Sequence, residues 1–505
     1  MHGIIGYGGY VPRLRLQRAA VVQANAWYAP QFKAKAKGTR AFANWDEDSI
    51  TLAVAAARDC LGTNEDRSRI RAVTLASTTL PFADRLNAAV VCEALTLRDD
   101  VSAVDVGGSQ RVGLTAVLDG LARVRAGAGD TLVLAADNRQ TRPASAQELD
   151  YGDAAAAMLL GADSPRARVL AEALGSGTLT VDFVDHFRMS GDDIDYHWEE
   201  RWVRDEGISK LVPQAITAAL KQAQISAAQI DHFIFPSSFA KIDAQLAKGC
   251  GIRADAVVDG LAESVGETGV PHALLLLAQT LERAQPGQHI LVAQFGSGAQ
   301  AAVFRVTEHI NSFRPRCGVS AWLARGAMEA NYTKFLSFKQ QIRLERGMRG
   351  EQDKKTALST AYRHRSTILG LVAGKCSVTG SVHFPPSRLS YDQGAPLLDT
   401  QQPHKLAERG ATVLSWSAET LSFHMAPPHH YGQVDFDGGG RILMDFTDLD
   451  VGEVQSGTKV EMVFRVKDID ELRGFTRYFW KATPVRAAAP APAGTSPAAS
   501  PATLG

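Results

Sequence analysis

Two stretches of the chain repeat one pattern, and this pattern decides the fold. In the first, LARVRAG at 121–127 leads to the apolar run TLVLAA at 131–136, and a second apolar run follows at 154–161. In the second, LERAQPG at 281–287 leads to ILVAQ at 290–294 and then to AAVFRV at 301–306. Strands that are apolar throughout and alternate with helix-like runs are typical of sheets covered on both faces. Two copies of one such unit indicate a duplicated α/β domain.

The repeat extends toward the N-terminus. IRAVTLAS at 70–77 and DHFIFPSS at 231–238 each follow a helix-like run and a polar link. Residues 1–308 are therefore predicted to form one layered α/β domain of two similar βαβ-type halves. The start of the chain, MHGIIG at 1–6, reads as a buried strand without a basic leader or a cleavage site.

The pattern changes after residue 308. Residues 309–368 are predicted to be a helical linker in which Asn331–Thr356 is a solvated helix, because basic and acidic side chains alternate there. Short strands with Gly and Pro turns follow at 369–486 and predict a small β-barrel. Asp437-Gly438-Gly439-Gly440 is interpreted as a hairpin turn, since no helix follows it. The Ala/Pro-rich segment 487–505 is expected to be a disordered tail.

Composition excludes several classes of function. The 505 residues contain 54 Lys plus Arg and 54 Asp plus Glu, so the formal net charge is zero. This balance argues against nucleic acid or an acidic membrane as a partner. No apolar run approaches the roughly 20 residues of a membrane span. Five unclustered cysteines suit a reducing compartment, so a cytoplasmic enzyme is expected.

Four motifs give the chain a family resemblance. WDEDSITLA at 45–53, the stretch 148–161, GETG at 266–269 and FGSGA at 295–299 stand in the order found in hydroxymethylglutaryl-CoA synthase. That enzyme is a member of the thiolase superfamily, whose core is duplicated. The tract from Cys376 onward resembles the zinc-ribbon and OB-fold domain that accompanies thiolase-like subunits. The resemblance implies an acyl-CoA substrate, and thus coenzyme A as the carrier, and a homodimer formed through the core.

The catalytic groups of the family are partly missing. The segment that resembles its nucleophile loop, VDVGGSQRVGLTA at 104–116, places Gln110 at the position of the cysteine and Ser109 beside it. Gln cannot act as a nucleophile, and Ser109 would need a nearby base. The nearest cysteine, Cys92, is predicted to be a small core residue. FPSSFAK at 235–241 resembles the family's histidine motif and has Pro236 at the histidine position.

Carboxylates remain as candidate acid–base groups. Glu47 matches the family's general acid/base carboxylate by the resemblance, and Glu267 stands where the family has an asparagine, with His272 following. We expect Glu47 and Glu267, with His272 nearby, to transfer protons without a covalent intermediate. The alternative for Glu267 is a cap on a helix over 271–281, since acidic residues suit helix starts.

Candidate residues for binding CoA come from three segments. Lys241 matches the family lysine associated with the CoA phosphates, although a solvated surface lysine is nearly as common. Ser237 and Gln110, in the two family-like motifs, are further candidates. Arg188 belongs to the polar-aromatic stretch around 185–201, which either borders a pocket or forms a salt-bridged flap.

The zinc ribbon has lost its ligand pattern. Four thiolates close a tetrahedral zinc site, yet only Cys376 is present. The other three ligand positions hold Thr379, Ser390 and Gln393, so no metal is expected. His383 and Asp392 are the remaining side chains of the ribbon that could bind one.

Three functions are consistent with these residues. The leading hypothesis is an acyl-CoA enzyme that forms or cleaves a carbon–carbon bond by aldol or retro-aldol chemistry. The second is a synthase-like acyltransferase that uses Ser109 or another nucleophile. The third is a non-catalytic scaffold that binds acyl-CoA.

Overall fold

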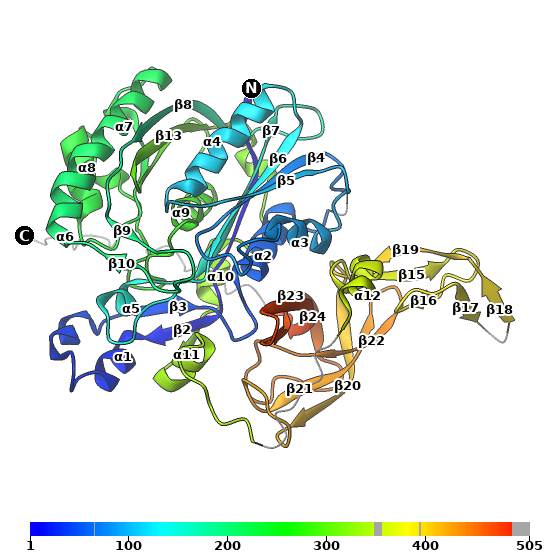
Figure 1. Cartoon of the computed structure of the whole chain (residues 1–505). Helices are drawn as coiled ribbons and strands as arrows, with labels where there is room; N and C mark the ends of the chain where they lie inside the picture. The colour runs from blue at the N-terminus through cyan, green and yellow to red at the C-terminus, as the bar shows by residue number, and fades with distance from the viewer. Residues whose placement is uncertain (65, 348–355, 393–394, 487–505) are drawn as a thin grey trace, which may run out of the picture.

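The computed structural model describes residues 1–64, 66–347, 356–392 and 395–486. The predicted tail at 487–505 and Gln393 lie outside these residues. Within them, the core is built on a nine-stranded sheet with the order β11-β12-β13-β8-β1-β7-β6-β4-β5 (Figure 1). The strands of this sheet are β1 (His2–Tyr10), β4 (Ile70–Ala76), β5 (Ser102–Val106), β6 (Asp130–Asp137), β7 (Ala154–Ala162), β8 (Ala171–Thr180), β11 (His232–Ile234), β12 (His289–Phe295) and β13 (Gly298–Val306).

The sheet confirms the duplication. In the first half, one parallel and two antiparallel pairings connect neighbouring strands in the order β4, β6, β7 and β1. The second half repeats these pairings, with the same strand directions, in the order β11, β12, β13 and β8. The two halves join where β1 and β8 pair in antiparallel register. β5 extends the first half beyond β4, and in the second half a parallel bridge from Phe233 to Val257 takes the corresponding place.

Helices cover both outer faces and fill the space between the halves. α2 (Ser49–Leu61) and α3 (Asn87–Ala94) pack on the first half, and α7 (Ser209–Ala223) packs on the second. α4 (Val112–Arg125) and α9 (His272–Leu281) lie in the cluster between the halves (Figure 1). The α9 sequence HALLLLAQTL is apolar around its whole circumference because it is buried on all sides. A Cβ at Gly113 in α4 would lie 2.6 Å from the Val270 carbonyl oxygen, so this close approach requires glycine.

The segment after the second half is part of the core. β14 (Ala327–Glu329) pairs with β2 (Leu14–Gln17), which also pairs with β3 (Thr39–Phe42). α10 (Val319–Ala324) and α11 (Tyr332–Phe338) precede a non-helical stretch, so the prediction of one solvated helix over 331–356 is wrong. Lys339, which directly follows α11, is only 3% exposed and places its Nζ 2.5 Å from an Asp153 carboxylate oxygen. Burial lowers the pKa of Lys339 to about 8.

The C-terminal domain is the predicted barrel. Its sheet has the order β22-β21-β20-β23-β24, in which Asp437–Gly440 forms the turn between β21 and β22. α12 (Leu358–Arg363) and α13 (Arg365–Ile368) lead into the smaller sheet β16-β15-β19 and the hairpin β17–β18, which projects away from the core (Figure 1). The strands are β15 (Val372–Cys376), β16 (Val382–His383), β17 (Leu389–Asp392), β18 (Ala395–Leu398), β19 (Gln401–Lys405), β20 (Ala411–Glu419), β21 (His429–Phe436), β22 (Arg441–Asp445), β23 (Lys459–Asp470) and β24 (Phe475–Pro484).

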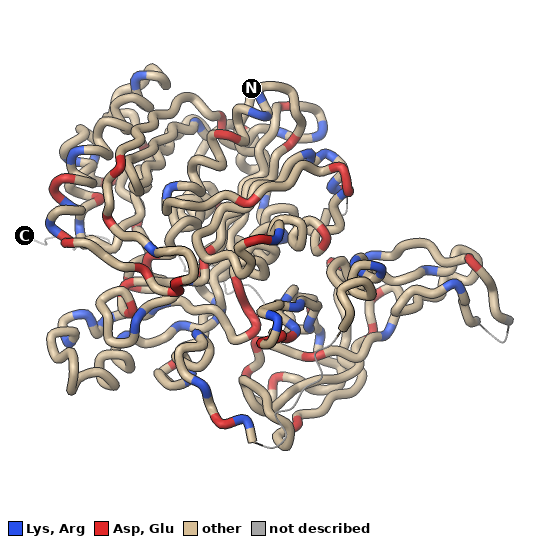
Figure 2. Tube along the Cα trace, in the orientation of Figure 1, with Lys and Arg blue, Asp and Glu red and all other residues tan. Residues whose placement is uncertain are grey.

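Charged residues of both signs occur throughout this fold. In Figure 2, basic and acidic residues are interspersed over both domains, in agreement with the zero net charge. None of the helices in the described part of the chain has the length and apolar character needed to cross a membrane.

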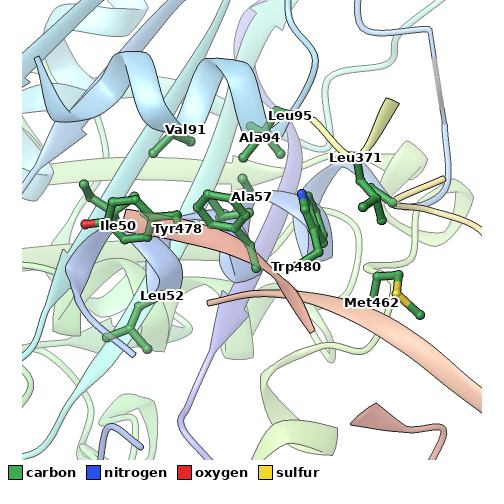
Figure 3. Close-up of a cluster of buried hydrophobic side chains, with 14 of the residues drawn as sticks. Ile50, Leu52, Ala57, Val91, Ala94, Leu95, Leu371, Met462, Tyr478 and Trp480 are labelled. Atoms are coloured by element: carbon green, nitrogen blue, oxygen red, sulfur yellow. The ribbon is translucent and has the colours of Figure 1, made fainter. Parts of the chain in front are cut away.

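The barrel shares a hydrophobic core with the first domain. Trp480 and Tyr478 on β24 pack against α2 and α3, in the cluster that also contains Ile50 and Leu95 (Figure 3). Trp480 is fully buried, and its indole N–H donates to the Leu369 carbonyl at 2.6 Å. This arrangement buries both domains' apolar surfaces in one contact, so the two domains pack as a unit.

A buried charge cluster lies in the same junction. The Arg465 guanidinium on β23 is 1% exposed and pairs with Glu47 at 3.0 Å and with Asp448 at 2.7 Å. Lys481 on β24 pairs with Asp46 at 2.8 Å, and both side chains are at most 2% exposed. Asp46 and Glu47 therefore supply carboxylates that cations of the barrel neutralise.

We predict that Arg465→Met strongly destabilises the protein. It leaves the carboxylates of Glu47 and Asp448 buried without their cation, a change that costs about 3–5 kcal/mol in buried pairs. Urea unfolding followed by tryptophan fluorescence measures the loss. Arg388→Met is the matched control, because its ion pair with Asp399 is solvent-exposed and should contribute less than about 1 kcal/mol. Equal stabilities of the two variants would contradict this account of the junction.

Candidate active site

A cavity of about 190 Å³ opens in the first domain near the ends of several sheet strands. Its walls come from the loop after β5, the segment before β7, the loop after β11 and the hairpin of β9 (His186–Phe187) and β10 (Tyr196–His197). The polar residues that line it include Gln110, Tyr151, Asp185, His186, His197, Ser237 and Glu267.

Arg139, two residues beyond β6, holds several of these walls together. Its guanidinium is buried and pairs with Glu267 on one nitrogen and with Asp195 at 3.3 Å on the other. The same guanidinium lies over the Tyr151 ring, 3.3 Å from the ring centroid. The Arg139–Asp195 pair ties the β9–β10 hairpin to the core, and Asp195 also pairs with Arg188 of the same hairpin at 2.8 Å.

Glu267 is held in its ionised form. Burial alone would raise its pKa, but the Arg139 charge, His272 and the Gly269 N–H lower the pKa of Glu267 to about 2. The Gly269 N–H donates to its Oε1 at 2.8 Å. A carboxylate with this pKa carries no proton at neutral pH and is a weak base, and its contacts with Arg139 and the Gly269 N–H position the loop and the guanidinium. It does not cap α9, because the bond to Gly269 lies before the helix.

His272 lies directly behind Glu267. Its Nδ1 is 3.5 Å from the Glu267 Oε1 and accepts from the Thr268 N–H at 3.2 Å, while its Nε2 donates to the Gly260 carbonyl at 2.9 Å. Both ring nitrogens are therefore occupied by the protein. His272 fixes the Gly266–Gly269 loop and does not line the cavity.

The β9–β10 hairpin brings two histidines into the cavity. His186 and His197 pair across the strands and stack with ring centroids 5.6 Å apart. The His186 Nδ1 contacts the Asp185 carboxylate at 2.8 Å, and its Nε2 contacts the Gln110 side-chain amide at 3.2 Å. The His197 Nε2 contacts the Tyr151 hydroxyl at 2.8 Å. Burial, His186 and Arg139 lower the pKa of His197 to about 4, so that ring is neutral.

The sequence left this stretch open between a pocket border and a salt-bridged flap, and the structure shows both. Asp185 and His186 line the cavity, whereas Arg188 forms the ion pair with Asp195. Arg188 is thus directed into the hairpin's own salt bridge and is not among the residues that line the cavity.

The other predicted residues are distributed as follows. Gln110 and Ser237 line the cavity together with Glu267. Ser109 faces away from it, since its hydroxyl donates to the Gly296 carbonyl at 3.0 Å. Lys241 is exposed and begins the turn into α8 (Ile242–Cys250), two residues beyond Phe239 of the cavity wall.

Glu47 is separated from Glu267. Its carboxylate accepts from the Tyr10 hydroxyl at 2.6 Å and from the Asn44 N–H at 2.8 Å, and it pairs with Arg465 of the barrel. It is not among the residues that line the cavity, so the expectation that the two glutamates face one pocket is corrected. The cause is Arg465, a cation from the second domain that sequence reasoning on the first domain did not include. Burial raises the pKa of Glu47 to about 7.

Three functional side chains were not singled out from the sequence: Arg139, Tyr151 and His197. Arg139 and Tyr151 lie on irregular segments and His197 lies in a two-residue strand, so periodicity gives no information about which way these side chains face. The one usable signal was the pair of motifs Asp185-His186 and Tyr196-His197, whose spacing allows a short hairpin that brings the two imidazoles together.

In the degenerate zinc ribbon, hydrogen bonds connect the residues around Cys376. The Cys376 Sγ contacts the Thr400 hydroxyl at 3.2 Å, and that hydroxyl donates to Ser390 at 3.2 Å. The Thr379 N–H donates to the same sulfur at 3.5 Å, and His383 contacts Ser381 at 3.1 Å. No group of three or more His, Cys, Asp or Glu side chains that could hold a metal occurs in the residues described. The side chain of Asp392 lies outside them.

Comparison with known proteins agrees with this architecture. Residues 220–306 match the family "3-Oxoacyl-[acyl-carrier-protein (ACP)] synthase III C terminal", and residues 405–465 match "ChsH2, C-terminal OB-fold domain". Hydroxymethylglutaryl-CoA synthase of Aeropyrum pernix is 28% identical over 345 residues, which cover 67% of this chain and 94% of that protein. The enzyme of the same name from Methanosarcina mazei is 28% identical over 351 residues, 68% of this chain and 99% of that protein.

Solved structures show the same fold. An HMG-CoA synthase complexed with CoA superimposes with a TM-score of 0.58 at 16% identity, covering 70% of this chain and 95% of that one. The 3-oxoacyl-(acyl carrier protein) synthase III FabH from Pseudomonas aeruginosa gives a TM-score of 0.53 at 20% identity, covering 61% and 98%.

The first domain is therefore similar to hydroxymethylglutaryl-CoA synthases, and the domain that follows it matches the C-terminal OB-fold domain of ChsH2.

We predict that Glu267→Gln loses stability in a pH-dependent way. Because the folded pKa of about 2 lies below the unfolded value, the contribution of Glu267 is complete above about pH 5 and fades as the pH falls toward 2. The pKa shift of Glu267 corresponds to a stabilisation of roughly 3 kcal/mol at neutral pH. The difference in unfolding free energy between wild type and Glu267→Gln should therefore narrow by about 2 kcal/mol by pH 3. Urea unfolding at a series of pH values measures this gap.

Glu263→Gln serves as the control, because Glu263 forms an exposed pair with Lys37 and should change stability by less than about 1 kcal/mol. A gap for Glu267→Gln that stays constant from pH 7 to pH 3 would disprove the assignment of an ionised carboxylate.

Proposed function

We propose that this protein forms or cleaves a carbon–carbon bond in an acyl-CoA by aldol-type chemistry that needs no acyl-enzyme. One observation carries the proposal. The position of the family nucleophile holds Gln110, and the cavity around it is lined by imidazole, phenol and carboxylate groups, without a thiol among the described lining residues.

None of the five cysteines is among the residues that line the cavity, which supports this proposal. Burial raises the pKa of Cys92 and of Cys317 to about 12, so these thiols are protonated and poorly nucleophilic at neutral pH. Cys60 is buried in the core and Cys376 belongs to the ribbon network of the second domain. Cys92 is partly buried and packs against the hydrophobic cluster that the two domains share.

Aldol chemistry fits the groups that are present. A polarised thioester carbonyl makes the neighbouring carbon acidic, and the enolate that forms is stabilised by hydrogen-bond donors at its oxygen. A neutral imidazole can carry the proton, and the Tyr151 hydroxyl is a donor within the same cavity. Pockets for drug-sized ligands occupy about 300–1,000 Å³. The smaller cavity here, about 190 Å³, favours a short acyl group.

CoA as the carrier is supported by the relatives and by Lys241. The similar proteins are named as synthases of a CoA ester, and one similar structure is described as complexed with CoA. Lys241 presents an exposed ammonium beside the wall formed by residues 235–239, where the anionic end of CoA could reach it.

A synthase-like condensing enzyme with a different nucleophile is the second candidate. The comparisons favour it, since the relatives are hydroxymethylglutaryl-CoA synthases. Ser109 argues against it, because its hydroxyl proton is directed to the Gly296 carbonyl and not to a base. A scaffold that only binds acyl-CoA is the third candidate.

Trapping distinguishes these functions. We expect incubation with short-chain acyl-CoAs and 3-hydroxyacyl-CoAs to give turnover of at least one substrate, with no acyl adduct in the intact mass of the quenched protein. A covalent adduct would establish the condensing enzyme with a nucleophile. Binding of CoA esters without turnover across the panel would establish the scaffold.

We predict that Cys92→Ala retains turnover within a few-fold of wild type, because Cys92 packs in the core and forms no acyl-enzyme. Steady-state kinetics on the substrate found by the panel measures this effect, and circular dichroism reports whether the variant is folded. An inactive but folded Cys92→Ala protein would refute the proposed mechanism.

We predict a homodimer. β5 is the edge strand of the sheet, and its Val104 side chain is 45% exposed, so this edge is open to the same edge of a second copy across a two-fold axis. Light scattering at micromolar concentration should give twice the chain mass of 54.2 kDa, and Val104→Arg should lower it toward the single-chain mass. A single-chain mass for wild type would rule this out.

A further inference from the structure

The β9–β10 hairpin contributes an aspartate–histidine pair that neither the family resemblance nor the comparisons assign. We propose that Asp185 and His186 are the proton-transfer pair of this cavity, with the His186 Nε2 as the general base. This inference rests on the proposed aldol-type function and names the group that performs its central step.

The hydrogen bonds fix the required tautomer. Because an ionised carboxylate can only accept a hydrogen bond, the 2.8 Å contact with Asp185 places the proton of a neutral His186 on Nδ1. The lone pair is then on Nε2, where the Gln110 amide nitrogen donates at 3.2 Å in the absence of substrate. Substrate can take the place of the Gln110 amide at this nitrogen. The orientation of a basic imidazole nitrogen by a carboxylate on the opposite nitrogen is the arrangement that activates histidine bases in general.

The location of the pair explains how the cavity functions without the family's groups. Gln110 stands at the position of the family nucleophile, and Pro236 at that of the family histidine, and both line the cavity. His186 therefore brings an imidazole from a different segment into hydrogen-bond distance of the nucleophile position. Its side chain is 17% exposed, as is that of Asp185, so the pair is shielded but open to a ligand.

Tyr151 and His197 form the second half of this arrangement. When His197 donates its Nε2–H to the Tyr151 oxygen across their 2.8 Å contact, the hydroxyl hydrogen of Tyr151 is free for a carbonyl oxygen. Arg139, stacked on the Tyr151 ring, keeps positive charge beside this hydroxyl. The pair therefore provides a donor for the oxygen that becomes negative when the enolate forms.

The step balances for cleavage of a 3-hydroxyacyl-CoA. The His186 Nε2 takes the proton of the 3-hydroxyl group, the oxygen electrons form a carbonyl, and the bond between carbons 2 and 3 breaks. Its electron pair moves into the thioester enolate, whose oxygen accepts from the Tyr151 hydroxyl. After the aldehyde or ketone leaves, the imidazolium returns its proton to carbon 2, giving a shortened acyl-CoA. Condensation is the reverse, and neither direction requires an oxidant or a covalent intermediate.

Variants of the pair test the assignment with the full-length protein. We expect His186→Gln to lower kcat by about 100- to 10,000-fold with CoA-ester binding retained in calorimetry. Asp185→Asn should lower kcat at least ten-fold, since an Asn amide can donate to Nδ1 and so stabilise the wrong tautomer. His232→Gln is the matched control, because His232 begins β11, contacts Gln288 at 3.0 Å and lies outside the cavity lining; its kcat should equal that of wild type.

A second readout does not depend on turnover. Histidine-labelled NMR should show His186, assigned from its loss in His186→Gln, as the Nδ1–H tautomer, and Asp185→Asn should shift it toward Nε2–H. His186→Gln with wild-type kcat would overturn the assignment while leaving the aldol function standing. A wild-type protein that binds CoA esters but turns over none of the acyl-CoAs and 3-hydroxyacyl-CoAs would overturn both the assignment of His186 and the aldol function. An Nε2–H tautomer in wild type would also overturn the assignment, whatever the turnover.

Discussion

The buried guanidinium of Arg139 is the constraint on which the candidate site depends. It pairs with Glu267 from the loop before α9 and with Asp195 from the β9–β10 hairpin, and it stacks on Tyr151 from the segment before β7. A buried cation requires such compensation, because an unpaired charge in this environment is strongly unfavourable. Three segments far apart in the sequence are therefore held at one point, and the two histidines of the hairpin are oriented as a result.

The junction with the barrel follows the same physical rule. Arg465 and Lys481 enter the first domain and neutralise Asp46 and Glu47, while Trp480 and Tyr478 fill the apolar contact beside them. Because charge and apolar surface are both matched there, the barrel is a structural part of the core. This also gives Glu47 a role at the domain junction, at a site distinct from the cavity that Glu267 lines.

Features that depend on periodicity were predictable from sequence. The repeated apolar strands gave the duplicated sheet, and the short strands with Gly turns gave the barrel, since both rest on local alternation and turn chemistry. Gln110, Ser237 and Glu267 were placed at the cavity by the resemblance. Lys339 was misjudged because a single buried lysine in a polar run has no local signal, and its partner Asp153 lies far away in the chain. The hairpin pair Asp185–His186 was visible as a polar stretch, but only the fold shows that it faces Gln110.

Exchange of the α-hydrogens of an unreactive acyl-CoA with deuterium oxide tests the central claim most directly, because it isolates the proton transfer from any second substrate. The account predicts that wild-type protein incorporates deuterium at carbon 2, that His186→Gln does so at least 100-fold more slowly, and that the protein mass remains unchanged throughout. Exchange by His186→Gln at the wild-type rate, or an acylated protein in place of exchange, would contradict it.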